Sequence, residues 1–300
     1  MSGRYAICAL ALLSLGAAAR PPALQPVAPK PLPAADWARQ CADDDGWDKP
    51  GPPFRIHGNT WYVGTCGITA ILVTSDAGHV LIDSGTEQGA AVVLGNVARA
   101  GFWIGDVKLL LMSHEHFDHV GGMALLQKRS GAALATSPAA VPVMRSGEPA
   151  RDDPQYGRLP RFAGVGKVYP VDAGTTALAA RTVFRPLPSP GHTPGAMSWS
   201  WQSCDKGKCL SIVYADSFNP ISADGYRYSD HPEYVAAFRT ALIQLADLDC
   251  DILITPHPGS SSMRQRILGS GLIDPSGCMR YAKTMTKRLD DRIAQEQAGK

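Results

Sequence analysis

The sequence predicts a single α/β domain in which a group of strands followed by helices occurs twice along the chain. Short apolar runs bounded by turn residues, such as Val107–Leu111 and Ile252–Ile254, are typical of buried strands. Apolar residues at helical spacing, such as Phe238, Leu242 and Leu245, are typical of amphipathic helices. Loops that contain Gly and Pro follow several of the expected strands. Strands and helices in this order form a layered domain built around sheets.

In the first half of the chain, strands are expected between Phe54 and Asp83. Apolar runs alternate there with turn signals at Gly58–Asn59 and Asp76–His79. A helix is expected from Gln88 to Ala100, and a short one from Met123 to Lys128.

The second half is expected to begin with a helix from Ser137 to Arg145. A polar loop over 146–166 follows, and a loop of that length inside a compact domain usually has a function. Gln155, Tyr156 and Phe162 in this loop are available to contact a substrate. The last amphipathic helix carries Tyr281, Met285, Leu289 and Ile293, and the strands expected before it are Lys167–Val171, Thr182–Leu187, Met197–Ser203 and Leu210–Tyr214.

Composition and charge narrow the class of partner. The 300 residues are 45% hydrophobic and 19% charged, as in an ordinary soluble globular protein. A formal net charge of +2, with no dense run of Lys and Arg, gives no support for binding nucleic acid. We therefore expect no nucleic-acid partner. The expected partner is a small-molecule substrate, and the expected state is a monomer.

The first 19 residues are expected to form a signal peptide. Arg4 supplies a positive charge, residues 5–15 form an apolar run, and residues 16–19 form a small-residue cleavage site. The apolar run is too short to span a bilayer. We therefore expect export to the periplasm without a membrane anchor.

Residues 20–35 are rich in Pro and Ala and are expected to form an extended leader. The folded domain should then occupy residues 36–300 and begin near Asp36. Cys8 lies inside the apolar part of the signal peptide and is expected to leave with it.

The six remaining cysteines favour disulfide bonds, because an even number in an exported chain is more typical of cross-links than of free buried thiols. Two of them flank an expected hairpin loop, and two others lie next to a buried strand and at the start of the last helix. The pairs that we expect are Cys204–Cys209 at the hairpin, Cys250–Cys278, and the remaining pair Cys41–Cys66, which would tie the N-terminal leader to the body.

The strongest chemical signal is the segment after the strand Val107–Leu111. His114 and His116 lie two residues apart, so on extended backbone they project to the same side and can bind one ion. Asp118 and His119 are adjacent, and a turn must present them elsewhere, so that one motif can serve two metals. Imidazole with one carboxylate and no thiolate suits catalytic Zn²⁺.

Two later histidines lie in similar surroundings. His192 is held in a turn between Ser189-Pro190-Gly191 and Thr193-Pro194-Gly195, and His257 follows the apolar strand Ile252–Ile254 within Thr255–Gly259. Either histidine alone would be more typical of a structural or surface residue. Their shared context, a strand followed by a Gly/Pro loop, predicts that they join the same site.

With these residues the chain resembles the metallo-β-lactamase superfamily. The resemblance spans about residues 54–260 and rests on three features. These are the pattern His-x-His-x-Asp-His, a later Gly-His-Thr and a last His after a strand. The resemblance implies a four-layer αβ/βα sandwich with the metals at one edge between two sheets.

The resemblance also implies the chemistry. Two Zn²⁺ would hold a hydroxide that attacks the β-lactam carbonyl, with Asp118 orienting it. Asp83 would support the metal ligands without binding a metal itself, although it is also placed to cap the helix that starts at Gln88. The first zinc would be held by His114, His116 and His192, and the second by Asp118, His119 and His257.

The substrate depends on the segment Tyr214–Ser217, where other β-lactamase subclasses have a zinc-binding Cys. This chain has none, and the resemblance is to the third subclass, with Ser217 at that position. Asn219 is a departure, since those enzymes commonly have Ser or Thr there in contact with the substrate carboxylate, but its amide can still donate a hydrogen bond. Gln155 of the long loop is a further expected contact. In a rival alignment Asp216 is a metal-bridging ligand, as in lactonases and in thioesterases of the glyoxalase II type. Spacing alone does not decide between them.

Two features favour the β-lactamase. Export places the enzyme where β-lactams act, whereas glutathione thioesters are mainly cytosolic. The segment after His257 is also short for a glyoxalase II substrate domain. The remaining hypothesis is a non-catalytic zinc-binding protein of the same fold, and the intact set of six ligands argues against it.

Overall fold

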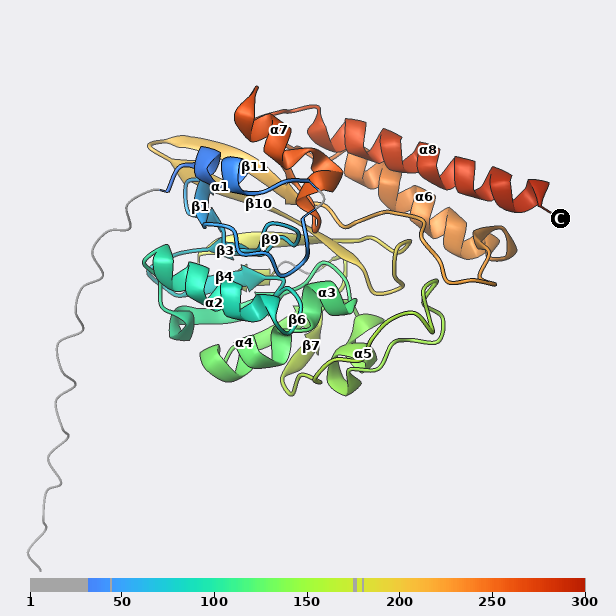
Figure 1. Cartoon of the computed structure of the whole chain (residues 1–300), viewed down its shortest axis with the longest axis horizontal. Helices are drawn as coiled ribbons and strands as arrows, with labels where there is room; N and C mark the ends of the chain where they lie inside the picture. The colour runs from blue at the N-terminus through green and yellow to red at the C-terminus, as the bar shows by residue number, and fades with distance from the viewer. Residues whose placement is uncertain (1–31, 44, 175–176, 180, 300) are drawn as a thin grey trace, which may run out of the picture.

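Two sheets lie face to face at the centre of the structure, and the helices lie on their outer sides (Figure 1). The computed structural model describes residues 32–43, 45–174, 177–179 and 181–299. The expected signal peptide over residues 1–19 and most of the leader lie outside the described residues. Among the residues that are described, none of the helices combines the length and the hydrophobicity needed to cross a membrane.

The first sheet has seven strands that follow one another in chain order. Pairing is antiparallel from β1 to β4 and parallel from β4 to β7, so helices return the chain across the sheet between the later strands. The strands are β1 (Phe54–His57), β2 (Thr60–Tyr62), β3 (Ile71–Val73), β4 (His79–Ile82), β5 (Val107–Leu111), β6 (Ala133–Thr136) and β7 (Val168–Pro170).

The second sheet has five strands in the order β12-β11-β10-β9-β8. Its one parallel pair joins β11 and β12, whereas the other neighbours are antiparallel. The short edge strand β8 has no counterpart among the predicted strands. The strands are β8 (Ala177–Ala179), β9 (Thr182–Pro188), β10 (Met197–Asp205), β11 (Lys208–Tyr214) and β12 (Ile252–Ile254).

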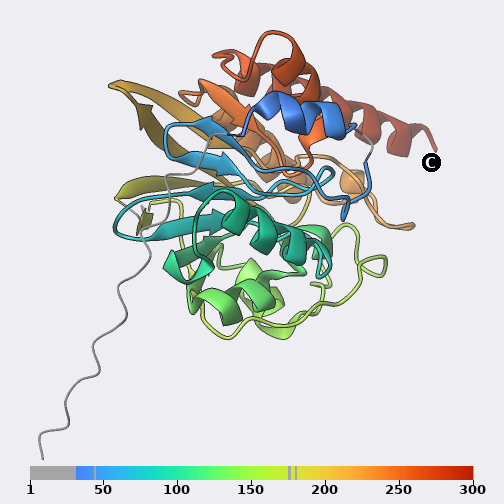
Figure 2. The ribbon, with the colours of Figure 1, turned by 60° about the vertical axis from the view of Figure 1, so that its left-hand side comes forward.

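The helices divide between the two outer sides, as Figure 2 shows from a second direction. On the side of the first sheet lie α2 (Gly89–Arg99), α3 (Phe117–Val120), α4 (Met123–Ser130) and α5 (Ala140–Ser146). On the side of the second lie α1 (Ala34–Gln40), α6 (Pro232–Ala246), α7 (Met263–Leu268) and α8 (Gly277–Ala298). Three 3₁₀ turns complete the fold: η1 (Ile104–Asp106), η2 (Tyr228–Asp230) and η3 (Pro258–Ser261).

Alternation along the strands explains the layers. Ile71 and Val73 of β3 point into the core between the sheets, whereas Leu72 points to the outer core under α2 and α4. In β12, Ile254 faces the inner core and Leu253 faces the core under α6 and α8. A strand buried on both faces needs such continuous apolar sequence. The predicted four-layer αβ/βα sandwich is confirmed.

Several boundaries differ from the sequence prediction, among them the start of one helix and the start of the folded domain. The helix expected from Ser137 begins at Ala140, because the Ser137 hydroxyl accepts the Ala140 N–H and donates to the carbonyl of Gly195, which holds a turn there. The folded domain was expected to begin near Asp36, and the helix α1, which was not predicted, begins at Ala34 and places Trp37 against Phe54 in the inner core.

The six cysteines form the three pairs expected from the sequence: Cys41–Cys66, Cys204–Cys209 and Cys250–Cys278. Cys204 and Cys209 face each other in the β10–β11 hairpin. The bond from Cys250 joins the chain just before β12 to the first turn of α8. The bond from Cys41 joins the end of α1 to the β2–β3 loop, so the N-terminal segment is fixed beside the body.

Loss of the Cys250–Cys278 bond should destabilise the protein more than loss of Cys204–Cys209. A cross-link restricts the unfolded chain more when it closes a longer loop. Sequence separations of 28 and 5 residues correspond to about 3.5 and about 2 kcal/mol in this loop-entropy treatment. Urea unfolding of Cys250→Ala/Cys278→Ala and of Cys204→Ala/Cys209→Ala measures both losses. An equal or larger loss at the hairpin would contradict this expectation.

Candidate metal centre

Loops from both halves of the chain meet where β5, β9 and β12 end. The first histidines follow β5, and α3 then carries Asp118 and His119. His192 lies in the turn between β9 and β10, and His257 lies just after β12. The ends of strands in two packed sheets thus hold side chains that are far apart in sequence.

Asp83 fixes the backbone at the end of β4. It adopts φ +61°, which is rare for a residue other than glycine and needs support from its surroundings. Its carboxylate accepts the Ser113 N–H and hydroxyl, both at 2.7 Å, and the Tyr214 hydroxyl at 2.6 Å. The same oxygen lies 3.6 Å from His119 Nδ1. The alternative role as a helix cap falls to Thr86, whose hydroxyl accepts the Gly89 N–H.

His114, His116 and His192 form a first cluster. One ligand atom of each lies within 4.8 Å of the others. Their ring centroids are 4.8 to 4.9 Å apart, and all three side chains are buried. Three imidazoles that share a buried point in this way form a set of nitrogen ligands suited to Zn²⁺.

Each ring of this first cluster is held at one nitrogen by an oxygen atom. His114 Nδ1 lies 2.8 Å from Asp216 Oδ1, and His116 Nε2 lies 2.9 Å from Asp153 Oδ2. His192 Nδ1 donates to the carbonyl of Asn219 at 2.8 Å. Partners of this kind fix the tautomer and leave the other ring nitrogen free as a ligand.

Asp118, His119 and His257 form a second cluster with closer contacts. Asp118 Oδ2 lies 3.1 Å from His119 Nε2 and 3.3 Å from His257 Nε2. The two histidine nitrogens are 3.3 Å apart. Ligands at about 2.0–2.1 Å from a tetrahedral zinc are about 3.3 Å from one another. The three atoms therefore already have the spacing of zinc ligands.

The two clusters adjoin each other. Ligand atoms of His114, Asp118 and His119 also lie within 4.8 Å of one another. The centroids of the His114 and His119 rings are 4.2 Å apart. Two cations bound here would be close neighbours.

Burial and neighbouring charges give the clusters opposite electrostatics. Burial and the nearby His116 lower the pKa of His192 to about 3, and burial with the neighbouring imidazoles lowers the pKa of His114 well below its usual value. Burial also acts to lower the pKa of His119, but the carboxylate of Asp118 outweighs it and raises that pKa to about 10. His114 and His192 thus offer neutral imidazoles, which metal binding requires, whereas His119 favours a positive charge beside Asp118.

Glu115 supports the site in a way that sequence analysis missed. Its buried carboxylate accepts the Thr193 hydroxyl and the Gly195 N–H, both at 2.8 Å. It therefore ties the first histidine loop to the loop that carries His192. Its position inside the His-rich motif was the only signal available, because the partners are far along the chain.

The expected substrate contacts lie around the first cluster. Gln155 Nε2 is 3.4 Å from His192 Nε2, and Asn219 contributes its backbone carbonyl to the same ring. The Ser217 hydroxyl is buried and has no hydrogen-bond partner. Of the other two loop residues expected to be available, Tyr156 is exposed, and Phe162 is half-buried and packs against the core under the first sheet.

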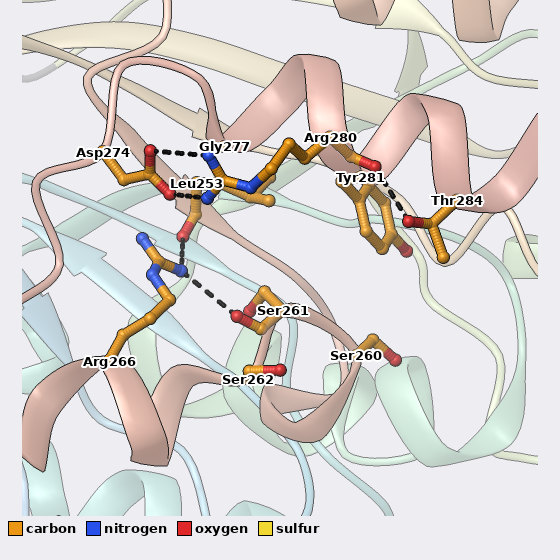
Figure 3. Close-up of a pocket in the computed structure, with 10 residues that line it drawn as sticks. All are labelled: Leu253, Ser260, Ser261, Ser262, Arg266, Asp274, Gly277, Arg280, Tyr281 and Thr284. Carbon is orange, nitrogen blue, oxygen red and sulfur yellow. Dashed lines mark hydrogen bonds and ion pairs between the residues drawn. The ribbon is translucent and has the colours of Figure 1, made fainter. Parts of the chain in front are cut away.

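A cavity of about 300 Å³ lies between η3, α7 and α8, behind the segment that carries His257 (Figure 3). Arg266, on its wall, donates to the carbonyl of Leu253 at 2.9 Å and to that of Ser261 at 3.5 Å, on either side of His257. Tyr281, on the same wall, donates to the carbonyl of Ser217 at 2.6 Å. The second helical layer thus fixes two backbone segments of the site.

Residues 63–205 match the family model of the metallo-β-lactamase superfamily. The structure of the MIM-2 metallo-β-lactamase is 54% identical to this chain, with a TM-score of 0.84, and the similarity covers 89% of this chain and 99% of that one. The chain belongs to the metallo-β-lactamase superfamily.

Other relatives agree with this family. MEM-A1, a subclass B3 metallo-β-lactamase from a soil metagenome library, is 40% identical with a TM-score of 0.81, covering 85% of this chain and 100% of that chain. The resemblance to the third subclass is thus confirmed. The probable metallo-hydrolase YflN of Bacillus subtilis (strain 168) is 27% identical over 126 residues, which are 41% of this chain and 45% of that protein. This match, like that to a second curated relative, covers less than half of the relative's own length.

Within this family, metal counting on two variants should separate the two alignments of Asp216 and Ser217. Ser217→Ala should keep the metal content of the unaltered protein, because both clusters are made of imidazoles and a carboxylate, and a neutral hydroxyl is not a usual zinc ligand. Asp216→Asn should also keep it, because Asp216 contacts His114 at Nδ1 and leaves Nε2 for the metal. A loss of metal in Asp216→Asn alone would favour the bridging role seen in lactonases and thioesterases.

Proposed function

We propose that the protein is a periplasmic zinc-dependent β-lactamase of the third subclass, which hydrolyses the amide bond of penicillins, cephalosporins or carbapenems. The observation that carries the proposal is the pair of adjoining ligand clusters in a chain whose similarity to MIM-2 covers almost all of that metallo-β-lactamase. MIM-2, SMB-1 and MEM-A1 all bear the name metallo-β-lactamase.

The donor atoms support two zinc ions. Nε2 of His114 is buried and has no hydrogen-bond partner, which is costly for a polar atom unless a ligand occupies the point that it faces. His114, His116 and His192 would hold the first zinc, and Asp118, His119 and His257 would hold the second. Bound zinc supplies Lewis acidity, which lowers the pKa of water toward neutrality and polarises a carbonyl group.

The protein side chains would position the reactants. Asp118 and His257 keep 11% and 33% of their side chains exposed, so the second cluster faces the solvent from which substrate arrives. The Asp118 carboxylate can accept a hydrogen bond from an attacking water and hold it in place. Gln155, Ser217 and Asn219 would contact the substrate, with the amide of Asn219 available to donate to its carboxylate.

The alternative is another exported dinuclear zinc hydrolase of this fold, a lactonase or a thioesterase of the glyoxalase II type. A lactonase or a thioesterase of that type requires Asp216 to bridge the metals. Asp216 is completely buried, and its carboxylate faces Nδ1 of His114 and the Phe218 N–H. These contacts favour a supporting role for Asp216 and thus the β-lactamase.

Three disulfide bonds support an exported protein, because such bonds persist in oxidising compartments. Together with the expected signal peptide they favour the periplasm, where β-lactams meet their targets. We infer a monomer without a membrane anchor.

Turnover of β-lactams by the purified mature chain tests this function. Nitrocefin and representatives of the three drug classes should be hydrolysed, with two zinc ions bound per chain. EDTA should abolish the activity, and added zinc should restore it. Clavulanate should have no effect, because no serine nucleophile takes part. Full activity in EDTA, or no turnover of any β-lactam by a chain that holds two zinc ions, would contradict the assignment.

His192→Ala should remove the first zinc and most of the activity while the protein stays folded. The loop remains held by Glu115 through Thr193 and Gly195, so the metal is not needed to shape it. His231→Ala is the matched control, since His231 is an exposed histidine that stacks on Tyr226, and it should keep both metals. Zinc content and circular dichroism give the readouts. Global unfolding of His192→Ala would instead show that zinc is structural here.

A further inference from the structure

Asp153 is a buried carboxylate that neither the zinc motif nor the expected substrate contacts include. It lies in the loop between α5 and β7, and only 2% of it is exposed. Oδ2 lies 2.9 Å from His116 Nε2, and Oδ1 accepts the Gln155 N–H at 2.7 Å. Both oxygens are therefore satisfied, as a buried carboxylate requires.

The bond to Asp153 makes His116 different from the other two histidines of the first cluster. His114 and His192 use Nδ1 for their supporting contacts and keep Nε2 for a ligand. His116 uses Nε2 for its support, so only Nδ1 is left to face the metal. A ring turned over about its χ2 axis would place Cδ2 where Nδ1 now lies and would offer the metal no ligand atom there.

We propose that Asp153 is a positioning residue, which holds the Nε2–H of His116 and thereby presents Nδ1 to the first metal. The proposal rests on the metal centre proposed above. It assigns to the long loop a part in building the first metal site, in addition to its part in contacting substrate.

The same loop joins the metal site to the substrate contacts. Gln155 follows Asp153 by two residues and reaches His192. The carbonyl of Pro154, which lies between them, accepts the N–H of Ala223 at 2.8 Å. This hydrogen bond joins the loop to the segment that carries Ser217 and Asn219. Displacement of Asp153 would therefore disturb both ring orientation and substrate contact, and the test must separate them.

The test compares Asp153→Ala, Asp153→Asn and the control Asp152→Ala in the full mature chain. Asp152 is the exposed neighbour with the same charge, so its removal matches the change in net charge without touching His116. Asparagine keeps an oxygen that can accept the Gln155 N–H and so preserves the turn. Zinc affinity is measured by competition with a chromophoric chelator, and folding by circular dichroism.

Asp153→Ala should weaken binding of the first zinc about 10–100-fold, as loss of such a supporting partner typically does. Asp153→Asn should also weaken it, because its oxygen accepts the Gln155 N–H and only its NH2 group, a donor, is left to face His116 Nε2. Asp152→Ala should not change it. In the unaltered protein, ¹⁵N NMR of the His116 ring should show that the ring proton lies on Nε2 and that it is protected from exchange with solvent.

The proposal would be overturned if both Asp153 variants bound the first zinc with an affinity within twofold of that of the Asp152→Ala control. A His116 ring that carries its proton on Nδ1 would also overturn it. If Asp153→Ala does not fold, the asparagine variant and the NMR measurement still decide. An unaltered chain that binds no zinc would instead contradict the metal centre itself.

Discussion

The site depends on three buried imidazoles that must stay neutral and be turned so that one nitrogen of each faces a common point. Burial among other histidines provides the first condition, since it lowers the pKa of His114 and His192. Oxygen atoms on the remaining ring nitrogens provide the second. These oxygens belong to Asp153, Asp216 and Asn219, which lie on two loops outside the histidine motif. The orientation of the ligands is therefore a property of the whole fold.

The four layers allow loops from distant parts of the chain to meet with little freedom. Strands buried on both faces end at fixed places, and each end carries one part of the site. Buried polar contacts then hold the loops in place. Glu115 joins the first two histidine loops. Arg266 donates to carbonyls on either side of His257, and Tyr281 donates to the carbonyl of Ser217. Helices of the outer layer thus contribute to the site without supplying a ligand.

Site residues can be assigned from the sequence where the chemistry is concentrated in short segments. The His-rich motif after an apolar strand, the Gly/Pro turn around His192 and the spacing of the cysteines can each be interpreted locally, and the structure brings those residues together. Asp153 and Glu115 could not be assigned in this way, because their partners lie far along the chain and a lone acidic residue in a loop has many possible roles. The packing of Phe162 under the first sheet likewise depends on tertiary structure and has no local signal in the sequence.

The central claim, two zinc ions in two separate ligand sets, is tested most directly by anomalous diffraction from crystals of the zinc-loaded mature chain, recorded above and below the zinc absorption edge. The account predicts two anomalous peaks, one bonded to His114, His116 and His192 and the other to Asp118, His119 and His257. A single peak, or a peak within bonding distance of Asp216, would contradict it.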